Sequence, residues 1–529
     1  MLHTWESLEL GRKKKTIELE SDVVVVGSGA GGAPLAYELS AQGYSVTLLE
    51  EGGYFPTESF RFDCRQAVMS LYRDGGLTFA AGIPATLCPV GRTVGGTTTI
   101  NQGTALRMPR GVLADWKCFH GIDDISYEEL CLYYQAVEEF IYVSKPDPDI
   151  AGLNASRFLE GARALGLQAS YLPRNAKDCE GYGVCCFGCP SGAKQSTNVS
   201  YIPEAVKKGA EVYADCRVEK IMIENSKATG LAGRFYKHDT GARGPRIKVH
   251  GKVVVLAGGT NGTPLLLMKN GLAGTSGQVG RNDALHPVTQ VVPVFDERID
   301  PHRGVSQSAW VHDFLGEGIS LETTVLPPDM LSTTIPQASA EHAAIMSEYP
   351  NSGLFGVMVK DSHTGRILPR PGGKFAVLYQ IGREDLKRMT RGNVVAAEIA
   401  FAAGAKRVYT MIAGHTRLDG HGDVKRLKAS KVRARQYFAM SGWHPMGTCR
   451  MGGDPDTSVV KPTGETWDVD NLFVSDASVL PTALGVNPQL TIMALSMRCA
   501  GFIDERLSGK SAVEELMEQV AGAPLEPSV

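Results

Sequence analysis

A strand, glycine turn, helix and second strand near the N-terminus constrain the fold of this chain more than any other feature. Four consecutive valines, Val23 to Val26, predict a strand that is buried on both faces. A glycine-rich turn over residues 27–32 follows, then a helical stretch at 33–41 and an apolar strand at 44–49 that ends at Glu50. These elements supply the context in which a glycine motif indicates dinucleotide binding.

The three glycines of this fingerprint have separate physical roles. Gly27 allows the tight turn, Gly29 lets the backbone approach a pyrophosphate, and Gly32 lets the helix pack closely on the strand. The helix N-terminus directs free N–H groups and a positive dipole end at the phosphates. Glu50 stands where a carboxylate can accept a hydrogen bond from a ribose hydroxyl. The Glu-Glu-Gly-Gly run that begins there is more typical of flavoproteins than of nicotinamide dehydrogenases.

Length and charge exclude several other classes. A chain of 529 residues is longer than one compact core usually holds, so we expect two intertwined domains or one large two-part unit. The net charge is −3 and no long basic run occurs, so nucleic acid is not an expected partner. We expect no signal peptide and no transmembrane segment. The expected location is cytoplasmic, or periplasmic or membrane-associated only if a partner, such as a small accessory subunit, carries the chain.

A second glycine-rich stretch, residues 91–107, resembles the first signature of the glucose–methanol–choline (GMC) oxidoreductases, G-R-x-x-G-G-[ST]-[ST]-x-x-N. In that family the loop lies along the isoalloxazine and pyrophosphate of FAD. Residues 258–267 resemble the second signature, and residues 442–452, 472–478 and 485–491 resemble the C-terminal motifs. The resemblance is strong at both ends of the chain and weak in the middle.

The resemblance implies an α/β fold (α+β overall), in which a Rossmann-type FAD-binding domain is interleaved with an antiparallel-sheet substrate domain. We assign residues 20–110, 195–290 and 440–507 to the FAD-binding domain. Residues 111–194 and 291–439 form the substrate or cap domain, including a cysteine-rich loop, and 508–529 form a C-terminal tail. Strands are expected near residues 290–295, 354–359 and 374–381, and a helix over 384–403.

The resemblance also implies the site residues. Those expected to contact FAD are Gly27, Gly29, Gly32, Glu50, Arg92, Gly95, Gly96, Thr97, Asn101, Val218, Asp476, Ala477, Pro488 and Gln489. His444 is the expected base and Asn487 its orienting partner. A neutral imidazole can remove a hydroxyl proton near pH 7, and a second polar group holds the developing alkoxide in place. We interpret His286, which lies in another family motif, as structural.

A cysteine-rich segment, residues 179–190, carries a further prediction. Its spacing, C-x5-C for Cys179 and Cys185 and C-x3-C-P for Cys185 and Cys189, could bring three thiolates to one iron–sulfur centre. The segment resembles a loop of bacterial FAD-dependent sugar dehydrogenases that is thought to hold a [3Fe–4S] cluster. Cys186 could replace Cys185. Free thiols, a disulfide or another metal remain alternatives, since other family branches have a cysteine-rich segment here without an established cluster.

The predicted function is the oxidation of an alcohol CH–OH to a carbonyl by hydride transfer to FAD. The substrate is a sugar, a long-chain alcohol or a sterol. With a cluster, electrons pass singly to a cytochrome or quinone and the protein is a dehydrogenase. Without one, the protein is an oxidase that uses oxygen, or it uses another two-electron acceptor. A hydroxynitrile lyase with a non-redox FAD is an alternative of a different class.

Overall fold

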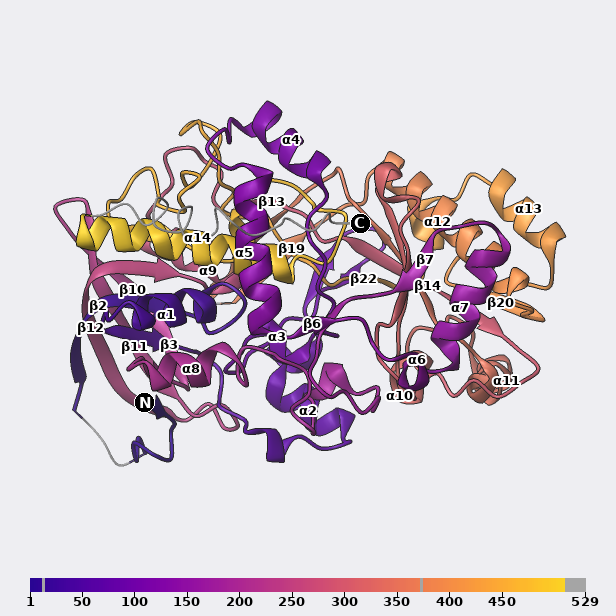
Figure 1. Ribbon diagram of the computed structural model, residues 1–529, viewed down its shortest axis with the longest axis horizontal. Helices are drawn as coiled ribbons and strands as arrows, with labels where there is room; N and C mark the ends of the chain where they lie inside the picture. The colour runs from indigo at the N-terminus through magenta and orange to yellow at the C-terminus, as the bar shows by residue number, and fades with distance from the viewer. Residues whose placement is uncertain (12–14, 372–373, 510–529) are drawn as a thin grey trace.

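The structure is a computed structural model that describes residues 1–11, 15–371 and 374–509. Two sheets divide the molecule, as Figure 1 shows. One sheet lies on the left with helices α1 (Gly32–Ala41) and α14 (Gln489–Ser508). The other lies on the right with α12 (Arg383–Ala402) and α13 (His421–Ala429). Almost all of the predicted C-terminal tail, residues 510–529, lies outside the described residues.

The first sheet is built on parallel strands, as the fingerprint predicts. Its strand order is β1-β9-β3-β2-β12-β11-β10, and β23 also pairs with β12. Pairing is parallel from β1 to β12 and between β12 and β23, whereas β11 and β10 form an antiparallel edge. The strands are β1 (Leu2–His3), β2 (Ile17–Val26), β3 (Val46–Leu49), β9 (Glu211–Tyr213), β10 (Cys216–Glu224), β11 (Lys227–Tyr236), β12 (Arg243–Leu256) and β23 (Leu472–Val474).

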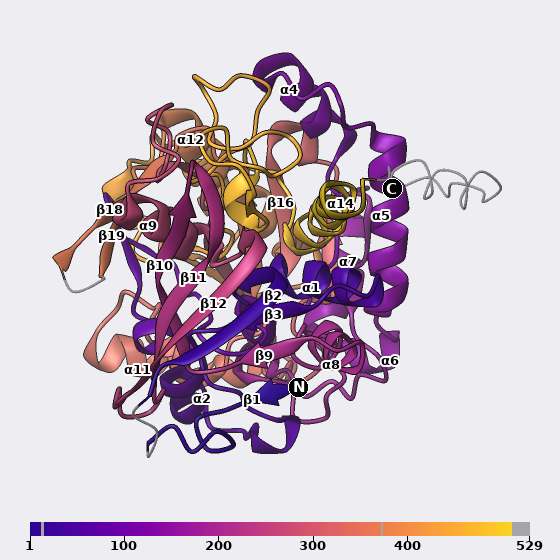
Figure 2. The same ribbon diagram turned by 90° about the vertical axis from the view of Figure 1, so that its left-hand side faces the viewer.

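Burial explains why the valine run forms the centre of this sheet. Val23, Val24 and Val25 are completely buried, and each contributes about 1.5–3 kcal/mol of transfer free energy. Figure 2 shows α1 and α14 stacked on one face of the sheet, with α5 (Tyr127–Phe140) outside them. Their apolar sides join the strands in one core. The sheet therefore has a covered face, as parallel strands require.

The second sheet is mixed. Its strand order is β13-β18-β19-β4-β5-β22-β14-β17-β16-β15-β7, with β20 attached to β14 and β21 attached to β20. Most pairs are antiparallel, but β4 pairs with β19 and β5 with β22 in parallel. The strands are β4 (Phe79–Ala81), β5 (Thr86–Leu87), β7 (Ala169–Tyr171), β13 (Arg281–Asp283), β14 (Pro287–Val294), β15 (Ala309–Val311), β16 (Ile319–Thr323), β17 (Phe355–Val359), β18 (Gly365–Pro369), β19 (Phe375–Leu378), β20 (Arg407–Thr410), β21 (Arg417–Leu418) and β22 (Met440–Gly442).

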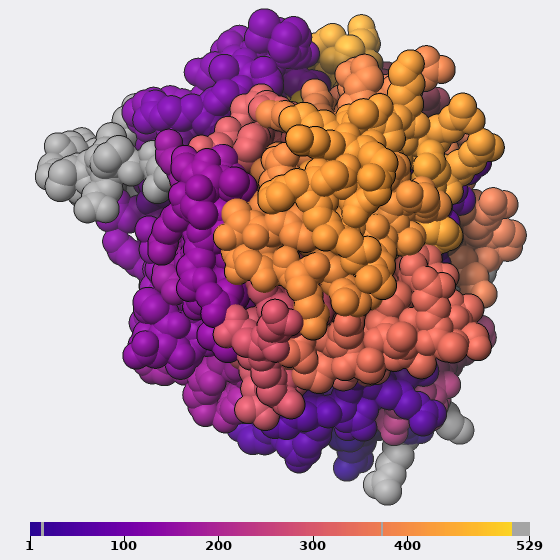
Figure 3. Space-filling view, turned by 90° about the vertical axis from the view of Figure 1, so that its right-hand side faces the viewer, coloured from indigo at the N-terminus to yellow at the C-terminus, as the bar shows by residue number. Residues whose placement is uncertain are grey.

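Helix α12 covers the second sheet and forms its own core with α7 (Leu153–Ala164). The end of the molecule farthest from the Rossmann sheet is covered by the orange and salmon segments in Figure 3, which include α13 and α11 (Ser339–Ser347). The two sheets and the helices that cover them confirm the predicted Rossmann-type domain and a second domain that is built on a sheet. The second sheet is mixed rather than purely antiparallel, because β4 and β5 enter it from a distant part of the chain.

The domain limits assigned from the sequence remain a proposal. Strands β4 and β5 come from residues 20–110 and β22 from 440–507, yet all three pair within the second sheet. Helix α5, from residues 111–194, packs on α14 beside the first sheet. Separately, among the helices of the described residues, none has the length and apolarity needed to cross a membrane.

A buried ion pair joins α14 to the chain around α5, which gives a stability prediction. Arg498 is 4% exposed and donates to Glu129 (2.8 Å) and to two backbone oxygens. Replacing Arg498 by Met leaves the largely enclosed Glu129 carboxylate, whose side chain is 12% exposed, without its partner, so the free energy of unfolding should fall by about 3 kcal/mol. Arg391→Met, which removes a half-exposed pair with Glu317, should cost less than about 1 kcal/mol. Urea unfolding of both variants measures the difference, and equal effects would contradict the assignment.

Candidate FAD and active site

A cavity of about 360 Å³ opens at the carboxyl ends of four parallel strands. The strands β2, β3 and β12 end directly before Gly27, Glu50 and Ala257, and β23 ends two residues before Asp476; all four residues line the cavity. In open α/β sheets, ligands bind at this edge because the strand ends and helix N-termini converge there. The second sheet closes the other side through residues of β14, β16 and β17.

Close backbone contacts explain three of the glycines. Gly27 has φ +95°, and a Cβ there would lie 2.2 Å from the Ala257 oxygen. A Cβ on Gly31 would lie 1.7 Å from the Ser475 oxygen, and one on Gly32 would lie 2.0 Å from the Gly27 oxygen. Any side chain at these positions would force the three chain segments apart.

Gly29 differs, because the protein itself does not require a glycine there. The nearest atom to a Cβ at Gly29 would be the Gly96 Cα, at 3.9 Å, and both glycines line the cavity. Space is therefore kept open on the ligand side. This cradle of bare backbone suits a phosphate group that approaches the turn closely.

Glu50 is held in place by the turn. Its carboxylate accepts hydrogen bonds from the Ser28 N–H (3.1 Å), the Ser28 hydroxyl (2.7 Å) and the Gly52 N–H (2.8 Å). Burial raises the pKa of Glu50, while the bonds from Gly52 and Ser28 oppose that shift. The carboxylate thus ties the end of β3 to the turn after β2 and faces the cavity.

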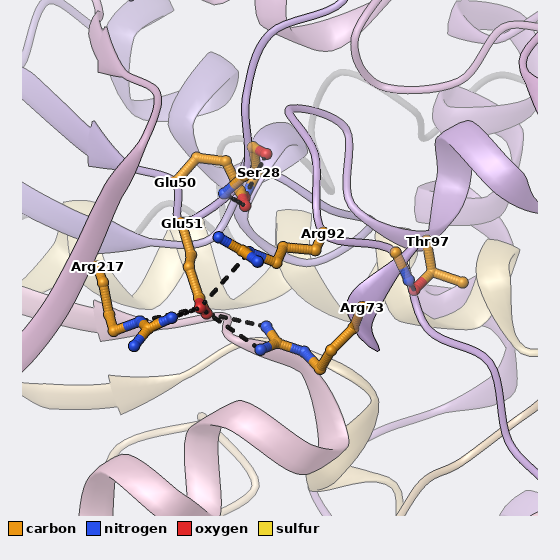
Figure 4. A network of polar contacts seen from close by, with 9 residues as sticks. Ser28, Glu50, Glu51, Arg73, Arg92, Thr97 and Arg217 are labelled. Atoms are coloured by element: carbon orange, nitrogen blue, oxygen red, sulfur yellow. Dashed lines mark hydrogen bonds and ion pairs between the residues drawn. The ribbon is translucent and has the colours of Figure 1, made fainter. Parts of the chain in front are cut away.

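Glu51, the next residue, is surrounded by three arginines (Figure 4). Arg73 and Arg217 approach it at 2.9 and 2.8 Å, and Arg92 at 3.7 Å. Although burial alone would raise the pKa of Glu51, the charges of Arg73, Arg217 and Arg92 hold it well below its ordinary value. Three cations around one carboxylate leave net positive charge, and Arg73 and Arg217 line the cavity. This environment favours an anionic ligand such as a pyrophosphate.

The far wall holds polar atoms that the protein leaves without partners. The Asn101 amide donates to the Gln489 side chain, and Gln489 Nε2 has no hydrogen-bond partner among the described residues. Asn487 Oδ1 is likewise unpaired within the described part of the chain. Both residues line the cavity. Because buried polar atoms are normally satisfied, these atoms indicate a ligand with hydrogen-bonding groups.

His444 and Asn487 meet at this wall. Asn487 Nδ2 lies 3.3 Å from His444 Nε2, and His444 Nδ1 lies 3.2 Å from His286 Nδ1. Burial lowers the pKa of His444 to about 4, so the imidazole is neutral near pH 7. His286 is completely buried behind it.

The structure reveals a carboxyl group that the sequence did not indicate. Glu322, on β16, is 5% exposed and lines the cavity. Gln307 Nε2 donates to it (3.0 Å), as does the Ser320 hydroxyl (3.1 Å), and Asn487 forms a further hydrogen bond with it. Burial raises the pKa of Glu322 to about 7, and the bonds from Ser320 and Asn487 oppose that shift. The available signal was weak, an acid in a short stretch in which Ile319 and Leu321 alternate with polar residues.

Most of the predicted site residues line one cavity. They are Gly27, Gly29, Glu50, Gly96, Thr97, Asn101, Val218, Asp476, Ala477, Pro488 and Gln489, with His444 and Asn487. Gly32, Arg92 and Gly95 lie behind its wall. Arg92 instead pairs with Glu51, and the Gly95 N–H donates to the Ser28 hydroxyl (2.9 Å).

Asp476 spans the junction between two elements. Its Oδ2 accepts from the Gly259 N–H (2.9 Å) and the Thr263 hydroxyl (2.6 Å), and its Oδ1 accepts from the Ser478 N–H (2.8 Å). These bonds join the end of β23 to the start of α9 (Gly259–Asn270) beneath the cavity. With β23 the chain returns to the Rossmann sheet after it has formed the strands of the second sheet.

The structure does not support the predicted cluster with Cys179, Cys185 and Cys189 as ligands. Among the described residues, no group of three histidine, cysteine or acidic side chains is arranged to hold a metal ion. All eleven cysteines are free thiols, so the disulfide alternative has no support either. Positive φ angles at Gly181, Gly183 and Gly188 turn the loop repeatedly, and such turns are not specified by cysteine spacing.

The cysteines have separate partners instead. Cys185 Sγ accepts from Arg174 (3.3 Å), and Cys186 Sγ accepts from Gln102 (3.2 Å). Burial would raise the pKa of Cys185, but the charges of Arg174 and Lys194 lower it. The buried Lys194 ammonium donates to the carbonyls of Thr99 (2.8 Å), Asn101 (2.7 Å) and Cys185 (2.9 Å). It therefore fastens the cysteine-rich loop to the loop that carries Asn101, and Cys186 alone of the four reaches the cavity wall.

Comparison with known families agrees with this geometry. Two models described as GMC oxidoreductase match residues 68–288 and 369–496, and a model of an NAD(P)-binding Rossmann-like domain matches residues 25–64. An uncharacterized GMC-type oxidoreductase of Sinorhizobium fredii is 33% identical, over 92% of this chain and 94% of its own length. The chain belongs to the GMC oxidoreductase family. It is a GMC-type FAD oxidoreductase that acts on CH–OH donors.

Relatives with named activities are more distant. A long-chain-alcohol oxidase of Arabidopsis thaliana is 29% identical, over 92% of this chain and 68% of its own length. A 2-methyl-1,2-propanediol dehydrogenase of Mycolicibacterium austroafricanum is 28% identical, over 92% of this chain and 96% of its own length. The structure of a pyridoxine 4-oxidase from Mesorbium loti matches with a TM-score of 0.70 and 20% identity, over 90% of this chain and 98% of that one, which shows a shared fold.

The Glu50 geometry generates a binding prediction for this GMC oxidoreductase. Glu50→Gln places an amide NH₂ against N–H donors, so at least one charge-assisted hydrogen bond is lost. FAD binding to the apoprotein should weaken about tenfold or more, since such a bond contributes ~1.5 kcal/mol. Fluorescence titration with FAD measures the change. Glu20→Gln, an exposed residue on the neighbouring strand β2, is the control and should bind as the wild type does. Unchanged affinity in Glu50→Gln would contradict the assignment.

The cysteine geometry generates a second prediction. Protein purified without oxygen should contain far less than one iron per chain and no acid-labile sulfide, because the thiols at Cys179, Cys185 and Cys189 have separate surroundings. Iron and sulfide analysis with EPR tests this expectation. About three irons per chain with a signal in the oxidised state would instead establish the cluster and a one-electron acceptor.

Proposed function

We propose that this GMC oxidoreductase oxidises an alcohol whose hydroxyl lies against His444 and Asn487 inside the cavity. The observation that carries the proposal is the approach of these two side chains, 3.3 Å apart, in the wall between the two sheets. Such a pair can position a hydroxyl and manage its proton. The relatives whose names state an activity act on alcohols, which supports the same class of substrate.

The residues present fit FAD. The bare backbone at Gly29 and Gly96 would receive the pyrophosphate, Glu50 a ribose, and Val218 the adenine. Asn101 and Gln489 would lie beside the isoalloxazine, where Gln489 Nε2 lacks a partner among the described residues. When bound, FAD supplies a two-electron acceptor for the hydride of the alcohol carbon. The protein contributes the positions of its side chains, exclusion of water, and control of the hydroxyl proton.

The substrate side of the cavity is mixed in character. Gln290, Gln307, Glu322 and Thr324 are polar, whereas Val288, Leu326, Met358 and Trp443 are apolar. A substrate with a hydroxyl beside an apolar portion fits this lining, so we propose a long-chain alcohol or a small branched diol ahead of a sugar or a sterol. Without a cluster, the proposed acceptor of electrons from the reduced enzyme is oxygen or another two-electron acceptor rather than a cytochrome.

Anaerobic addition of alcohols to the purified protein tests this function. We expect 1-dodecanol or 2-methyl-1,2-propanediol to bleach the flavin absorbance, with glucose and cholesterol as comparisons. His444→Ala should slow the bleaching by about 10²–10⁴-fold, because the group that contacts the hydroxyl is lost. The variant should retain FAD, since the predicted FAD contacts are unchanged.

The lyase alternative predicts a different result. A hydroxynitrile lyase would cleave mandelonitrile and leave the flavin oxidised in the presence of every alcohol. Failure of all four alcohols to bleach the flavin, with cleavage of the cyanohydrin, would contradict the proposed oxidation. Bleaching at wild-type rate in His444→Ala would contradict the role of His444.

A further inference from the structure

The hydrogen bonds of His286 determine where its proton lies. The Gly485 backbone N–H donates to His286 Nε2 at 3.0 Å, and a backbone donor cannot be reversed. His286 is completely buried, and burial holds its pKa well below the ordinary value, with the nearby charge of Lys360 acting in the same direction. The ring is therefore neutral and carries one proton. Because Nε2 accepts, that proton is on Nδ1.

The same reasoning extends to His444. His286 Nδ1 lies 3.2 Å from His444 Nδ1, so the His286 proton is donated to that atom. His444 is also neutral near pH 7, because burial lowers its pKa to about 4. With Nδ1 accepting, its single proton is on Nε2, the nitrogen that faces Asn487. Nε2–H can then donate to a hydroxyl oxygen, but Nε2 has no lone pair with which to take a proton.

The backbone around His286 holds this arrangement rigidly. Asp361 accepts from the N–H groups of Leu285 (2.9 Å) and His286 (3.1 Å), and His286 has φ +48°. A non-glycine residue persists in this conformation when its surroundings fix it. His286 is therefore a positioning residue for the His444 proton, rather than a histidine that only fills the core.

Glu322 can accept a proton, which Nε2 of His444 cannot do in this tautomer. It lines the same cavity and forms a hydrogen bond with Asn487, whose Nδ2 also lies 3.3 Å from His444 Nε2. In the tautomer derived above, both of those nitrogens are donors, so no hydrogen bond joins them and both can donate to an alcohol oxygen placed between them. A carboxylate accepts protons through either oxygen.

We propose that Glu322, rather than His444, accepts the hydroxyl proton of the alcohol, while His444 donates a hydrogen bond from Nε2 to the alcohol oxygen. The proposal rests on the proposed function and assigns the base within it. The O–H bond of the substrate breaks, and a new O–H bond forms on a Glu322 carboxylate oxygen. The electron pair of the broken bond stays on the substrate oxygen, where His444 stabilises it as the carbonyl forms. The C–H bond of the alcohol carbon also breaks, and FAD, when bound, would accept its hydride, so that the alcohol loses two electrons and two hydrogens in total.

The pH dependence of the two candidate bases differs. Glu322 acts as a base only when ionised, and burial raises its pKa to about 7, so activity should rise with pH through about 7 and be lost below it. A neutral His444 base would remain active down to about pH 4. The groups facing Glu322 are Ser320 on its own strand, Trp310 and Gly356 opposite it on β15 and β17, Gln307, and Asn487 with His444 beyond. Of these, His444 alone titrates.

Stopped-flow reduction of the flavin by the best alcohol of the panel tests the proposal across pH. We expect the wild type to show an acidic limb near pH 7. Glu322→Gln should lose about 10²–10⁴-fold and show no such limb, whereas Glu322→Asp should restore part of the rate. Glu317→Gln, a half-exposed glutamate just before the same strand, is the matched control and should keep the wild-type profile.

A readout other than activity keeps the test independent of turnover. Infrared difference titration should show a protonated carboxyl signal that appears below about pH 7 in the wild type and is missing in Glu322→Gln. Nitrogen-15 NMR of labelled histidine should place the His444 proton on Nε2 in the wild type. If Glu322→Gln fails to bind FAD, the acidic limb of the wild-type pH profile and the wild-type spectra test the proposal.

An acidic limb near pH 4 in the wild type, or a limb near pH 7 that Glu322→Gln retains, would overturn the proposal and return the base role to His444. Alcohol oxidation itself would survive that outcome. By contrast, a wild-type flavin that no alcohol reduces would refute the proposed function. The two failures are thus distinguishable.

Discussion

Direct backbone contact at the glycine turn is the constraint on which the rest of the site depends. Three segments that are far apart in the chain, around Gly27, Ala257 and Ser475, meet with no room for a Cβ between them. This contact aligns the carboxyl ends of four parallel strands at one edge of the sheet. The turn, Glu50 and Asp476 are thereby brought to a single cavity. A side chain at Gly31 would push α1 away from the end of β23. The start of α14, which follows Asn487 in the chain, would be displaced as well.

Burial without nearby opposite charges determines the protonation of the groups in the cavity wall around His444 and Glu322. His286 and His444 remain neutral because water is excluded from them, and their single protons are then fixed by the neighbouring donors and acceptors. Glu322 is held by uncharged donors, so burial moves its pKa toward neutrality. Glu51 shows the opposite case, because three arginines keep a partly enclosed carboxylate ionised. The two halves of the cavity therefore differ in chemistry, with net positive charge around Glu51 and, beside His444 and Asn487, a network of neutral donors around Glu322.

The sequence predicted the Rossmann half well because its signals are local. A run of valines, a glycine turn and a closing acid each specify their own conformation, and they follow one another directly in the chain. The motifs around His444 and Asn487 were equally informative, although the roles of these residues remain predictions. The mixed second sheet could not be predicted, because the partners of β4 and β5 come from distant segments. Glu322 was missed for the same reason, since its position against Asn487 depends on how two separate domains close around the cavity.

The cysteine-rich loop shows that cysteine spacing alone is not enough to predict a metal centre. Close cysteines predicted a metal centre, but Cys185, Cys186 and Cys189 accept hydrogen bonds from three separate donors, which are the Arg174 side chain, the Gln102 side chain and the Lys194 backbone N–H. The loop instead holds the wall of the cavity through the Lys194 ammonium. In this structure the loop supports the cavity wall, and Cys186 adds a thiol to the cavity lining.

The central claim is that the cavity at the ends of β2, β3, β12 and β23 holds FAD, and native mass spectrometry of the purified protein tests it most directly. This measurement detects both covalent and non-covalent cofactor. We predict a mass that exceeds the chain by one FAD. A chain without added mass, or with the mass of a nicotinamide dinucleotide in place of FAD, would contradict the account.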